Sequence, residues 1–194
     1  MRVLVSGASG LIGKALCASL VADGDEVVRL VRRSPAGADE VYWDPTKGEL
    51  EPGDVEGFDA IVHLAGAGIG DRRWSSRRRE LIVDSRVQST QLLADRIAGA
   101  KSKPGVFISG SAIGYYGIQE DPVVETDGPA DPPDFLSELV IAWEASTGAT
   151  EAAGVRTAHI RTGIVLSDRG GALKKLLLPF RAGIGGRLGS GATW

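Results

Sequence analysis

Short apolar runs alternate with helical patterns along the whole chain of 194 residues. The apolar runs predict strands at residues 1–6, 26–31, 41–43, 59–65, 106–109 and 157–161. Between them, amphipathic patterns predict a helix that continues over 14–21, a long helix over about 76–98 and another over 135–153. This alternation predicts an α/β fold, a Rossmann-type doubly wound parallel sheet with helices on both faces.

A glycine-rich turn joins the first predicted strand to the first predicted helix, with the sequence Gly7-Ala-Ser-Gly10-Leu-Ile-Gly13. Glycines at this spacing permit a tight turn, close approach of backbone to phosphate, and close packing of helix on strand. The helix N-terminus adds N–H donors and the positive end of its dipole. We therefore predict a dinucleotide-binding turn, with an ordinary strand-to-helix turn as the alternative. Its predicted cofactor-binding residues are Gly7, Ser9, Gly10, Leu11, Ile12 and Gly13.

The end of the second predicted strand indicates which cofactor binds. In NAD sites an acidic residue at this place hydrogen-bonds the 2′-hydroxyl of the adenosine ribose. This chain has Arg32 and Arg33 instead, and a planar guanidinium binds a 2′-phosphate with paired hydrogen bonds. The sequence therefore favours NADP over NAD, the alternative being a solvated basic strand end.

Composition limits the expected partners. The formal net charge of −3 gives no reason to expect nucleic acid or an anionic membrane. No targeting leader or membrane-spanning run is recognisable, so we expect a cytoplasmic protein. A local basic cluster is formed by Arg72, Arg73 and residues 77–79. It is either a solvated face or a site that attracts a phosphorylated substrate or the cofactor. No metal site is predicted.

Several stretches resemble a known family. The glycine turn and Asp59-Ala-Ile-Val-His-Leu-Ala-Gly66 resemble the extended short-chain dehydrogenase/reductases. More narrowly, the chain is similar to their atypical branch of "epimerase family proteins", also labelled nucleoside-diphosphate-sugar epimerase or cell-division-inhibitor-like. The stretches that carry this closer match are Trp43-Asp44-Pro45, Ser85-Arg86-Val87-x-x-Thr90, Ser111-Ala-Ile-Gly-Tyr-Tyr-Gly117 and Arg161-Thr-Gly-Ile-Val-Leu166.

The resemblance implies a domain organisation. It places a dinucleotide-binding Rossmann domain at residues 1–171 and the start of a substrate-side lobe at 172–194. Family members continue beyond this point, so we expect only the beginning of that lobe here. An interrupted lobe would leave apolar surface exposed, which favours association between copies of the chain.

The resemblance also implies further cofactor contacts. His63, Leu64, Ala65 and Gly66 would lie along the adenine and ribose side, and Ser85 with Arg86 would lie near the cofactor after the long helix. The loop at Gly163 and Ile164 would meet the nicotinamide. A histidine that ends a buried strand is also commonly a hydrogen-bonded core residue, and His63 is no candidate base in the family pattern.

The reaction centre departs from the family. Short-chain dehydrogenases use a Ser, a Tyr and a Lys, and Ser111 matches the Ser. The Tyr-x-x-x-Lys pair should open the next helix, where the chain has Phe135 and Leu139. Neither side chain exchanges a proton or carries charge. Tyr115 or Tyr116 is then the candidate catalytic acid, although the pair could equally pack under the cofactor. Glu138 is an alternative acid, which at a helix start could equally serve only to complement the helix dipole.

Two functions from different classes remain open. The first is an NADP(H)-dependent oxidoreductase or epimerase acting on a small carbonyl, hydroxyl or sugar-nucleotide substrate. The second is a non-enzymatic NADP(H) sensor, which the missing Tyr/Lys pair favours.

Overall fold

The computed structural model describes residues 1–119, 122–131 and 133–186. The chain divides into two compact units, Met1–Thr162 and a second that begins at Gly163. Each unit is considered by itself. The predicted domain boundary after residue 171 stays a prediction, because compact units need not coincide with domains.

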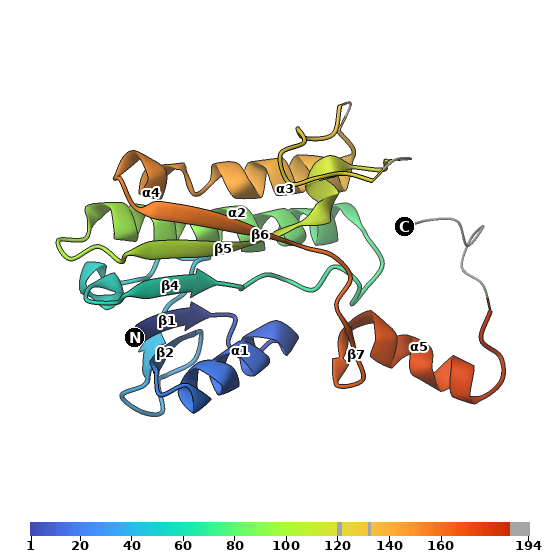
Figure 1. Cartoon of the computed structure of the whole chain (residues 1–194), viewed down its shortest axis with the longest axis horizontal. Coiled ribbons are helices and arrows are strands. Elements are labelled where there is room, and N and C mark those ends of the chain that lie inside the picture. The colour runs from blue at the N-terminus through green and yellow to red at the C-terminus, as the bar shows by residue number, and fades with distance from the viewer. Residues whose placement is uncertain (120–121, 132, 187–194) are drawn as a thin grey trace. The chain divides into compact units, whose positions relative to one another are not determined.

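The first unit is built on a six-stranded sheet with the order β3-β2-β1-β4-β5-β6 (Figure 1). Every neighbouring pair is parallel. The order reverses between β1 and β4, and open α/β sheets bind ligands at such a switch point, outside the carboxyl ends of the strands. The predicted Rossmann-type α/β fold is confirmed. The strands are β1 (Arg2–Ser6), β2 (Glu26–Val31), β3 (Glu40–Tyr42), β4 (Ala60–His63), β5 (Val106–Ala112) and β6 (Arg156–Thr162).

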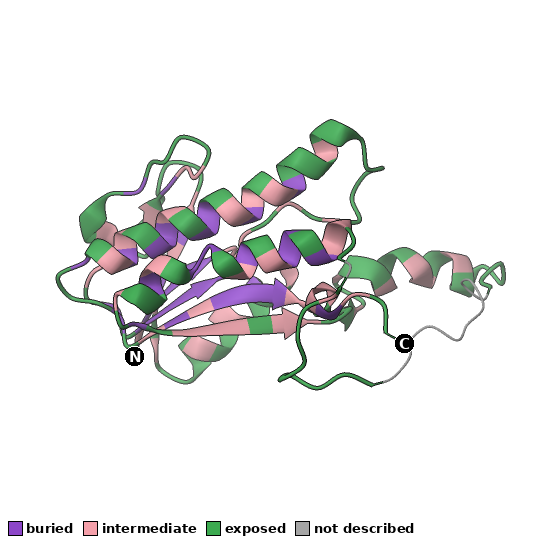
Figure 2. Ribbon diagram, turned by 90° about the horizontal axis from the view of Figure 1, so that it is seen from above, coloured by how far each residue is buried: buried purple, intermediate pink, exposed green. Residues whose placement is uncertain are grey.

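Helices cover both faces of this sheet. Helix α1 (Leu11–Ala22) packs against β1 and β2, whereas α2 (Ser76–Gly99) and α3 (Phe135–Ala145) lie on the opposite face (Figure 1). Alternate residues of β1 feed the two cores: Val3 and Val5 pack under α1, and Leu4 belongs to the core under α2. Figure 2 shows the buried residues on the sheet and on the helix sides that pack against it.

The prediction of one continuous helix over 135–153 is wrong, because the structure has two helices there. Helix α3 ends at Ala145, and α4 (Gly148–Ala152) begins three residues later. At the break, the hydroxyl of Ser146 donates to the carbonyl of Trp143 at 2.6 Å, and that of Thr147 donates to the carbonyl of Glu144 at 2.8 Å. Such side-chain bonds compete with the helical hydrogen bonds and interrupt the helix.

The remaining elements are short. A 3-10 turn, η1 (Pro52–Val55), precedes β4, and a second, η2 (Ile113–Tyr116), follows β5 directly. The second unit contains β7 (Leu166–Ser167) and α5 (Gly171–Arg181). Among the described helices, none is both long and apolar enough to cross a membrane.

Candidate functional site

The glycine turn fits closely between the ends of β1 and β4. Gly7 has a φ of +69°, and a Cβ there would lie 2.6 Å from the carbonyl carbon of Leu64. A Cβ at Gly13 would lie only 2.2 Å from the carbonyl oxygen of Gly7. Side chains at these two positions are therefore excluded by backbone atoms rather than by flexible neighbours.

The first turn of α1 is left open to a ligand. Gly10 is the N-cap residue and supplies no side-chain cap, so the N–H groups of Leu11 and Ile12 have no intrahelical partner. Ser9, Gly10 and Ile12 are exposed around this helix end, while Gly13 is buried beneath it. Oriented N–H donors and the helix dipole favour an anion at this place.

The two arginines after β2 have different environments. Arg33 forms a two-pronged ion pair with the buried Glu40, from Nη1 to Oε2 at 2.7 Å and from Nη2 to Oε1 at 2.6 Å. The hydrogen bond from Arg33, then the one from the Ala36 N–H, lowers the pKa of Glu40 to about 2. Arg32 is exposed and, within the described part of the chain, has no hydrogen bond or ion pair. Of the two predicted ligands, only Arg32 is therefore free to bind a phosphate.

His63 is a buried structural residue at the end of β4. Its Nδ1 lies 2.6 Å from the hydroxyl oxygen of Ser6 on β1, and its Nε2 lies 3.1 Å from that of Ser89 on α2. Burial, and secondarily the charge of Arg86, lowers the pKa of His63 to about 3. The imidazole is therefore neutral and ties together three elements, which is the core alternative raised from the sequence.

We expect His63 to make the free energy of unfolding depend on pH. Its pKa is lowered in the folded state, so between about 6.5 and 3 the unfolded chain binds a proton that the folded chain excludes. Stability is then lost as the pH falls through this window, by at most about 1.4 kcal/mol per pH unit. The free energy of unfolding, measured in urea at several pH values, should depend less steeply on pH in His63→Gln than in the unmodified protein. Equal slopes would contradict this account.

The loop after β4 is held by α2. The N–H of Ala67 donates to Ser85 Oγ at 3.0 Å, and Nη1 of Arg86 donates to the carbonyl of Ala67 at 3.1 Å. The fold thus brings Leu64, Ala65, Gly66 and Ser85 to the edge of the sheet where the glycine turn lies. Their contacts with a cofactor stay predictions. So do those of Gly163 and Ile164, which open the second unit.

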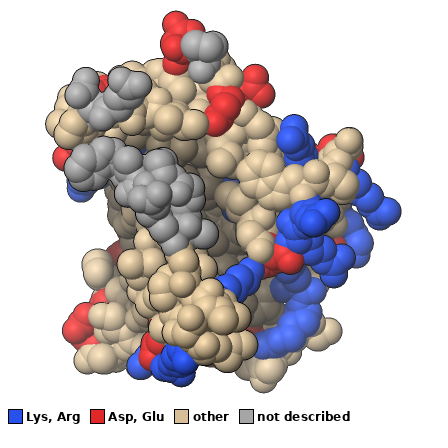
Figure 3. Space-filling view, turned by 90° about the vertical axis from the view of Figure 1, so that its right-hand side faces the viewer, with Lys and Arg blue, Asp and Glu red and all other residues tan. Residues whose placement is uncertain are grey.

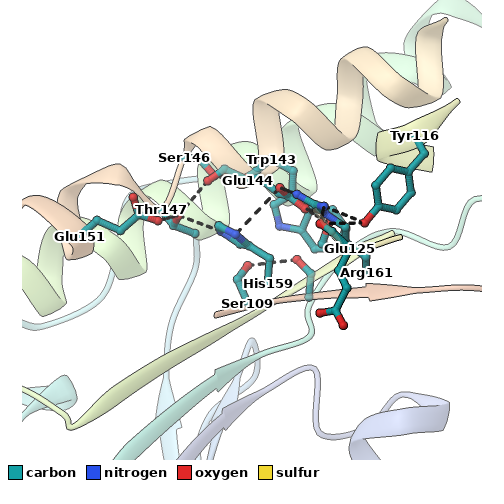
Figure 4. A network of polar contacts seen from close by, with 12 residues as sticks. Ser109, Tyr116, Glu125, Trp143, Glu144, Ser146, Thr147, Glu151, His159 and Arg161 are labelled. Atoms are coloured by element: carbon teal, nitrogen blue, oxygen red, sulfur yellow. Dashed lines mark hydrogen bonds and ion pairs between the residues drawn. The ribbon is translucent and has the colours of Figure 1, made fainter. Parts of the chain in front are cut away.

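A polar network lies at the carboxyl ends of β5 and β6 (Figure 4). Ser111 and Arg161 are register partners on these adjacent strands, and both reach Glu144 of α3. The Ser111 hydroxyl donates to Glu144 Oε1 at 2.5 Å, while Arg161 donates from Nε to Oε1 and from Nη2 to Oε2, each at 2.8 Å. Burial raises the pKa of Glu144, but the hydrogen bonds from Arg161 and Ser111 outweigh it and keep that pKa below its usual value. The carboxylate of Glu144 is therefore ionised, and both of its oxygens accept hydrogen bonds.

The guanidinium of Arg161 also holds both candidate tyrosines. Its Nη1 donates to the hydroxyl of Tyr116 at 2.8 Å, and its Cζ lies 3.5 Å from the ring centroid of Tyr115. Tyr116 is buried with its hydroxyl engaged. Tyr115 is half-buried, and among the described residues its hydroxyl has no hydrogen-bond partner. The geometry thus distinguishes two tyrosines that the sequence left equivalent.

The positions expected to carry the family's Tyr and Lys are packing positions. Phe135 meets the ring of Trp74 edge-on at 5.4 Å between centroids, and Arg79 lies 5.0 Å from the Phe135 ring centroid. Leu139 is buried. Neither Phe135 nor Leu139 can exchange a proton, and the acid between them in α3, Glu138, is exposed.

Sequence reasoning missed Glu144 and gave Arg161 no role of its own. Glu144 lies in a largely apolar helix, and the only available signal is an acid next to Trp143 in that stretch. Arg161 had appeared solely within a stretch that resembles the family. The β5–β6 register is what places Arg161 beside Ser111, and the position of α3 is what brings Glu144 to both.

Basic side chains gather on one side of the face shown in Figure 3. In the predicted basic cluster, Arg72, Arg73 and Arg77 are exposed, whereas Arg78 donates from Nη2 to the carbonyl of Gly68. Within the described residues, no group of three His, Cys, Asp or Glu side chains is arranged to hold a metal ion.

Comparison with known proteins gives consistent matches. A family model described as "NAD dependent epimerase/dehydratase family" matches residues 3–160. "Epimerase family protein MT2273" of Mycobacterium tuberculosis (strain CDC 1551 / Oshkosh) is 41% identical over 192 residues, which are 99% of this chain and 63% of that protein. "Epimerase family protein SDR39U1" of Homo sapiens is 39% identical over 193 residues, covering 98% of this chain and 64% of the human protein.

Two solved structures are similar over almost the whole chain. Human epimerase family protein SDR39U1 (isoform2) with NADPH has a TM-score of 0.85 and 37% identity, covering 99% of this chain and 63% of that one. The nucleoside-diphosphate sugar epimerase from Corynebacterium glutamicum has a TM-score of 0.83 and 37% identity, covering 98% of this chain and 39% of that one. The present chain thus spans less than two thirds of the length of these relatives.

Proposed function

Because this chain belongs to the NAD dependent epimerase/dehydratase family, we propose that it binds NADP(H) across the carboxyl ends of β1, β2 and β4. The family membership confirms the resemblance drawn from the sequence. The diphosphate would lie on the open N-terminus of α1, and the lack of side chains at Gly7 and Gly13 lets the turn pack closely against the end of β4 and the helix against the turn. The preference for NADP is carried by one observation, the free guanidinium of Arg32 directly after β2. The human relative solved with NADPH supports this choice.

Arg32→Asp tests the cofactor preference. We expect the unmodified protein to bind NADPH more tightly than NADH by about 10- to 100-fold, since hydrogen bonds to a charged group contribute about 1.5–3 kcal/mol. The variant should lose that preference, because a carboxylate repels the 2′-phosphate and accepts a bond from the 2′-hydroxyl. Titrations that follow nicotinamide fluorescence give both dissociation constants.

Arg33→Gln is the matched control for this experiment. Arg33 is already paired with Glu40, so its replacement should leave the NADPH preference intact. Loss of the preference in Arg33→Gln with retention in Arg32→Asp would contradict the assignment of Arg32.

The reaction that the site supports best is an oxidation or reduction of a small carbonyl or hydroxyl compound, or the epimerisation of a sugar nucleotide. The bound cofactor would supply or accept the hydride, and the residues at the ends of β5 and β6 would handle the proton. Tyr115 has the free hydroxyl that can exchange a proton with the substrate oxygen, and the guanidinium above its ring favours negative charge there. Ser111, whose hydrogen is directed to Glu144, remains an acceptor for a substrate hydroxyl. Glu144 fixes the guanidinium of Arg161 in this position.

The competing candidate is a non-enzymatic NADP(H) sensor. It is favoured by the internal hydrogen bonds that engage the hydroxyl hydrogen of Ser111 and both carboxylate oxygens of Glu144, and by the packing roles of Phe135 and Leu139. Oxidation of NADPH by a panel of carbonyl compounds distinguishes the two candidates, because a sensor would bind the cofactor without consuming it.

A further inference from the structure

A cluster of arginines that the proposed function leaves unused lies at the end of the loop after β4 and in the first turn of α2. Residues 68–79 contain five arginines and a single acid. The arginine cluster consists of Arg72, Arg73, Arg77, Arg78 and Arg79. The chain as a whole has a formal net charge of −3, so this local excess of positive charge attracts anions to one place on the surface.

Two members of the arginine cluster are held by contacts within the protein. Nη2 of Arg78 lies 3.9 Å from Oδ2 of Asp71, the single acid of this stretch. The guanidinium carbon of Arg79 lies 5.0 Å from the ring centroid of Phe135 and 5.9 Å from that of Trp74. These contacts fix the surface around which the remaining arginines stand.

The other three guanidinium groups are available to a ligand. Arg72, Arg73 and Arg77 are exposed, and among the described residues none of them has a hydrogen bond or ion pair. The first turn of α2 contains no acid, and the positive end of a helix dipole disfavours cations. Crowding cations at this place therefore costs stability until an anion binds. The arrangement favours a small anion with several charged oxygens, such as a phosphate group.

The arginine cluster adjoins the part of the site that carries Tyr115. Phe135, which meets the ring of Trp74 edge-on, is the first residue of α3. The same turn of α3 packs against η2, because a Cβ at Gly114 would lie 3.7 Å from the Cβ of Leu136. Tyr115 follows Gly114 directly. The arginine cluster and the candidate catalytic acid therefore flank the same end of α3.

We propose that the arginine cluster binds the phosphate group of a small phosphorylated substrate, whose carbonyl or hydroxyl group is thereby directed toward Tyr115. Guanidinium groups bind phosphate oxygens with paired, charge-assisted hydrogen bonds. A nucleic acid fits less well, because the acidic remainder of the chain would repel the rest of a polyanion. This inference rests on the proposed function and names the class of its substrate.

The test uses pyrophosphate as the probe, titrated by calorimetry into the protein saturated with NADPH. Because NADPH then fills the glycine turn, the heat reports binding elsewhere. Arg73→Gln and Arg77→Gln are made singly and together. Arg156→Gln is the matched control, because Arg156 is also exposed and unpaired among the described residues but begins β6, at the amino edge of the sheet. A short single-stranded DNA is titrated in parallel.

We expect pyrophosphate to bind saturably to the unmodified protein loaded with NADPH. The combined variant should bind pyrophosphate about 10- to 100-fold more weakly, as for the loss of hydrogen bonds to a charged group, and each single variant should lose part of this affinity. The dissociation constant of NADPH should not change. In the absence of ligands, the urea midpoint of the combined variant should equal or exceed that of the unmodified protein, because cations that repel one another are gone. Arg156→Gln should behave as the unmodified protein does.

Five outcomes would overturn the inference. If the unmodified protein binds NADPH but not pyrophosphate, the inference fails and the proposed function stands. Weaker NADPH binding in the combined variant would assign the arginine cluster to the cofactor site instead. An equal loss of pyrophosphate affinity in Arg156→Gln would show only a general effect of charge. Tighter binding of the DNA than of pyrophosphate would indicate a nucleic-acid partner. If the unmodified protein does not bind NADPH, the proposed function is refuted, and the assignment of a substrate to the arginine cluster with it.

Discussion

Tyr115→Phe is expected to lower turnover by about 100- to 10,000-fold while leaving the affinity for NADPH unchanged, as for the loss of a general acid. The substitution removes a single oxygen, and that oxygen has no partner among the described residues, so the fold should tolerate its loss. Oxidation of NADPH with a panel of carbonyl compounds measures turnover. A parallel fluorescence titration measures cofactor binding.

Tyr116→Phe is the matched control. It removes the hydroxyl that accepts a hydrogen bond from Arg161, so we expect a loss of about 1 kcal/mol in stability and a much smaller loss of turnover. An inactive Tyr116→Phe beside a fully active Tyr115→Phe would reverse the two roles. If the unmodified protein reduces none of the carbonyl compounds, the result would favour the non-enzymatic NADP(H) sensor.

Gly13→Ala is expected to abolish measurable dinucleotide binding and to lower the melting temperature by several degrees. The new methyl group would lie 2.2 Å from the carbonyl oxygen of Gly7 and 2.8 Å from the Cα of Ala8. These are backbone atoms, so relief requires α1 to move away from the glycine turn. That movement separates the N–H groups of the helix from the backbone of Gly7, and both are needed to surround the diphosphate. Fluorescence titration and thermal unfolding check the two effects.

Gly99→Ala provides a control of identical chemistry. Apart from its chain neighbours and the backbone of its own helix, no described atom lies within 4 Å of a Cβ built at Gly99, and its φ is not in the left-handed region. Alanine should therefore leave cofactor binding unchanged and raise stability by up to about 1 kcal/mol, because Gly99 is the last residue of α2. If Gly13→Ala and Gly99→Ala had the same cofactor affinity and the same melting temperature, the close approach of backbone atoms at Gly13 would not matter for binding or stability.

Local pattern was enough for much of the fold. The apolar runs and the glycine spacing predicted the parallel sheet, the order of its elements and the turn at Gly7, since each feature depends on a few consecutive residues. The resemblance to the family, rather than local pattern, indicated that Phe135 and Leu139 stand where the family's Tyr and Lys belong. Local pattern failed at the break between α3 and α4, where Ser146 and Thr147 bond to backbone carbonyls.

The chemistry of the site depended on contacts between distant parts of the chain. Arg32 and Arg33 are equivalent in the sequence, and only the position of Glu40 on the neighbouring strand leaves one free and one paired. The register of β5 and β6 places Ser111 beside Arg161, and α3 brings Glu144 to both. The sequence by itself determined which residues can bind phosphate or exchange a proton, because that is a property of residue type and local spacing. The tertiary structure alone decided which of them are paired and which are free, because pairing depends on how separate strands and helices pack.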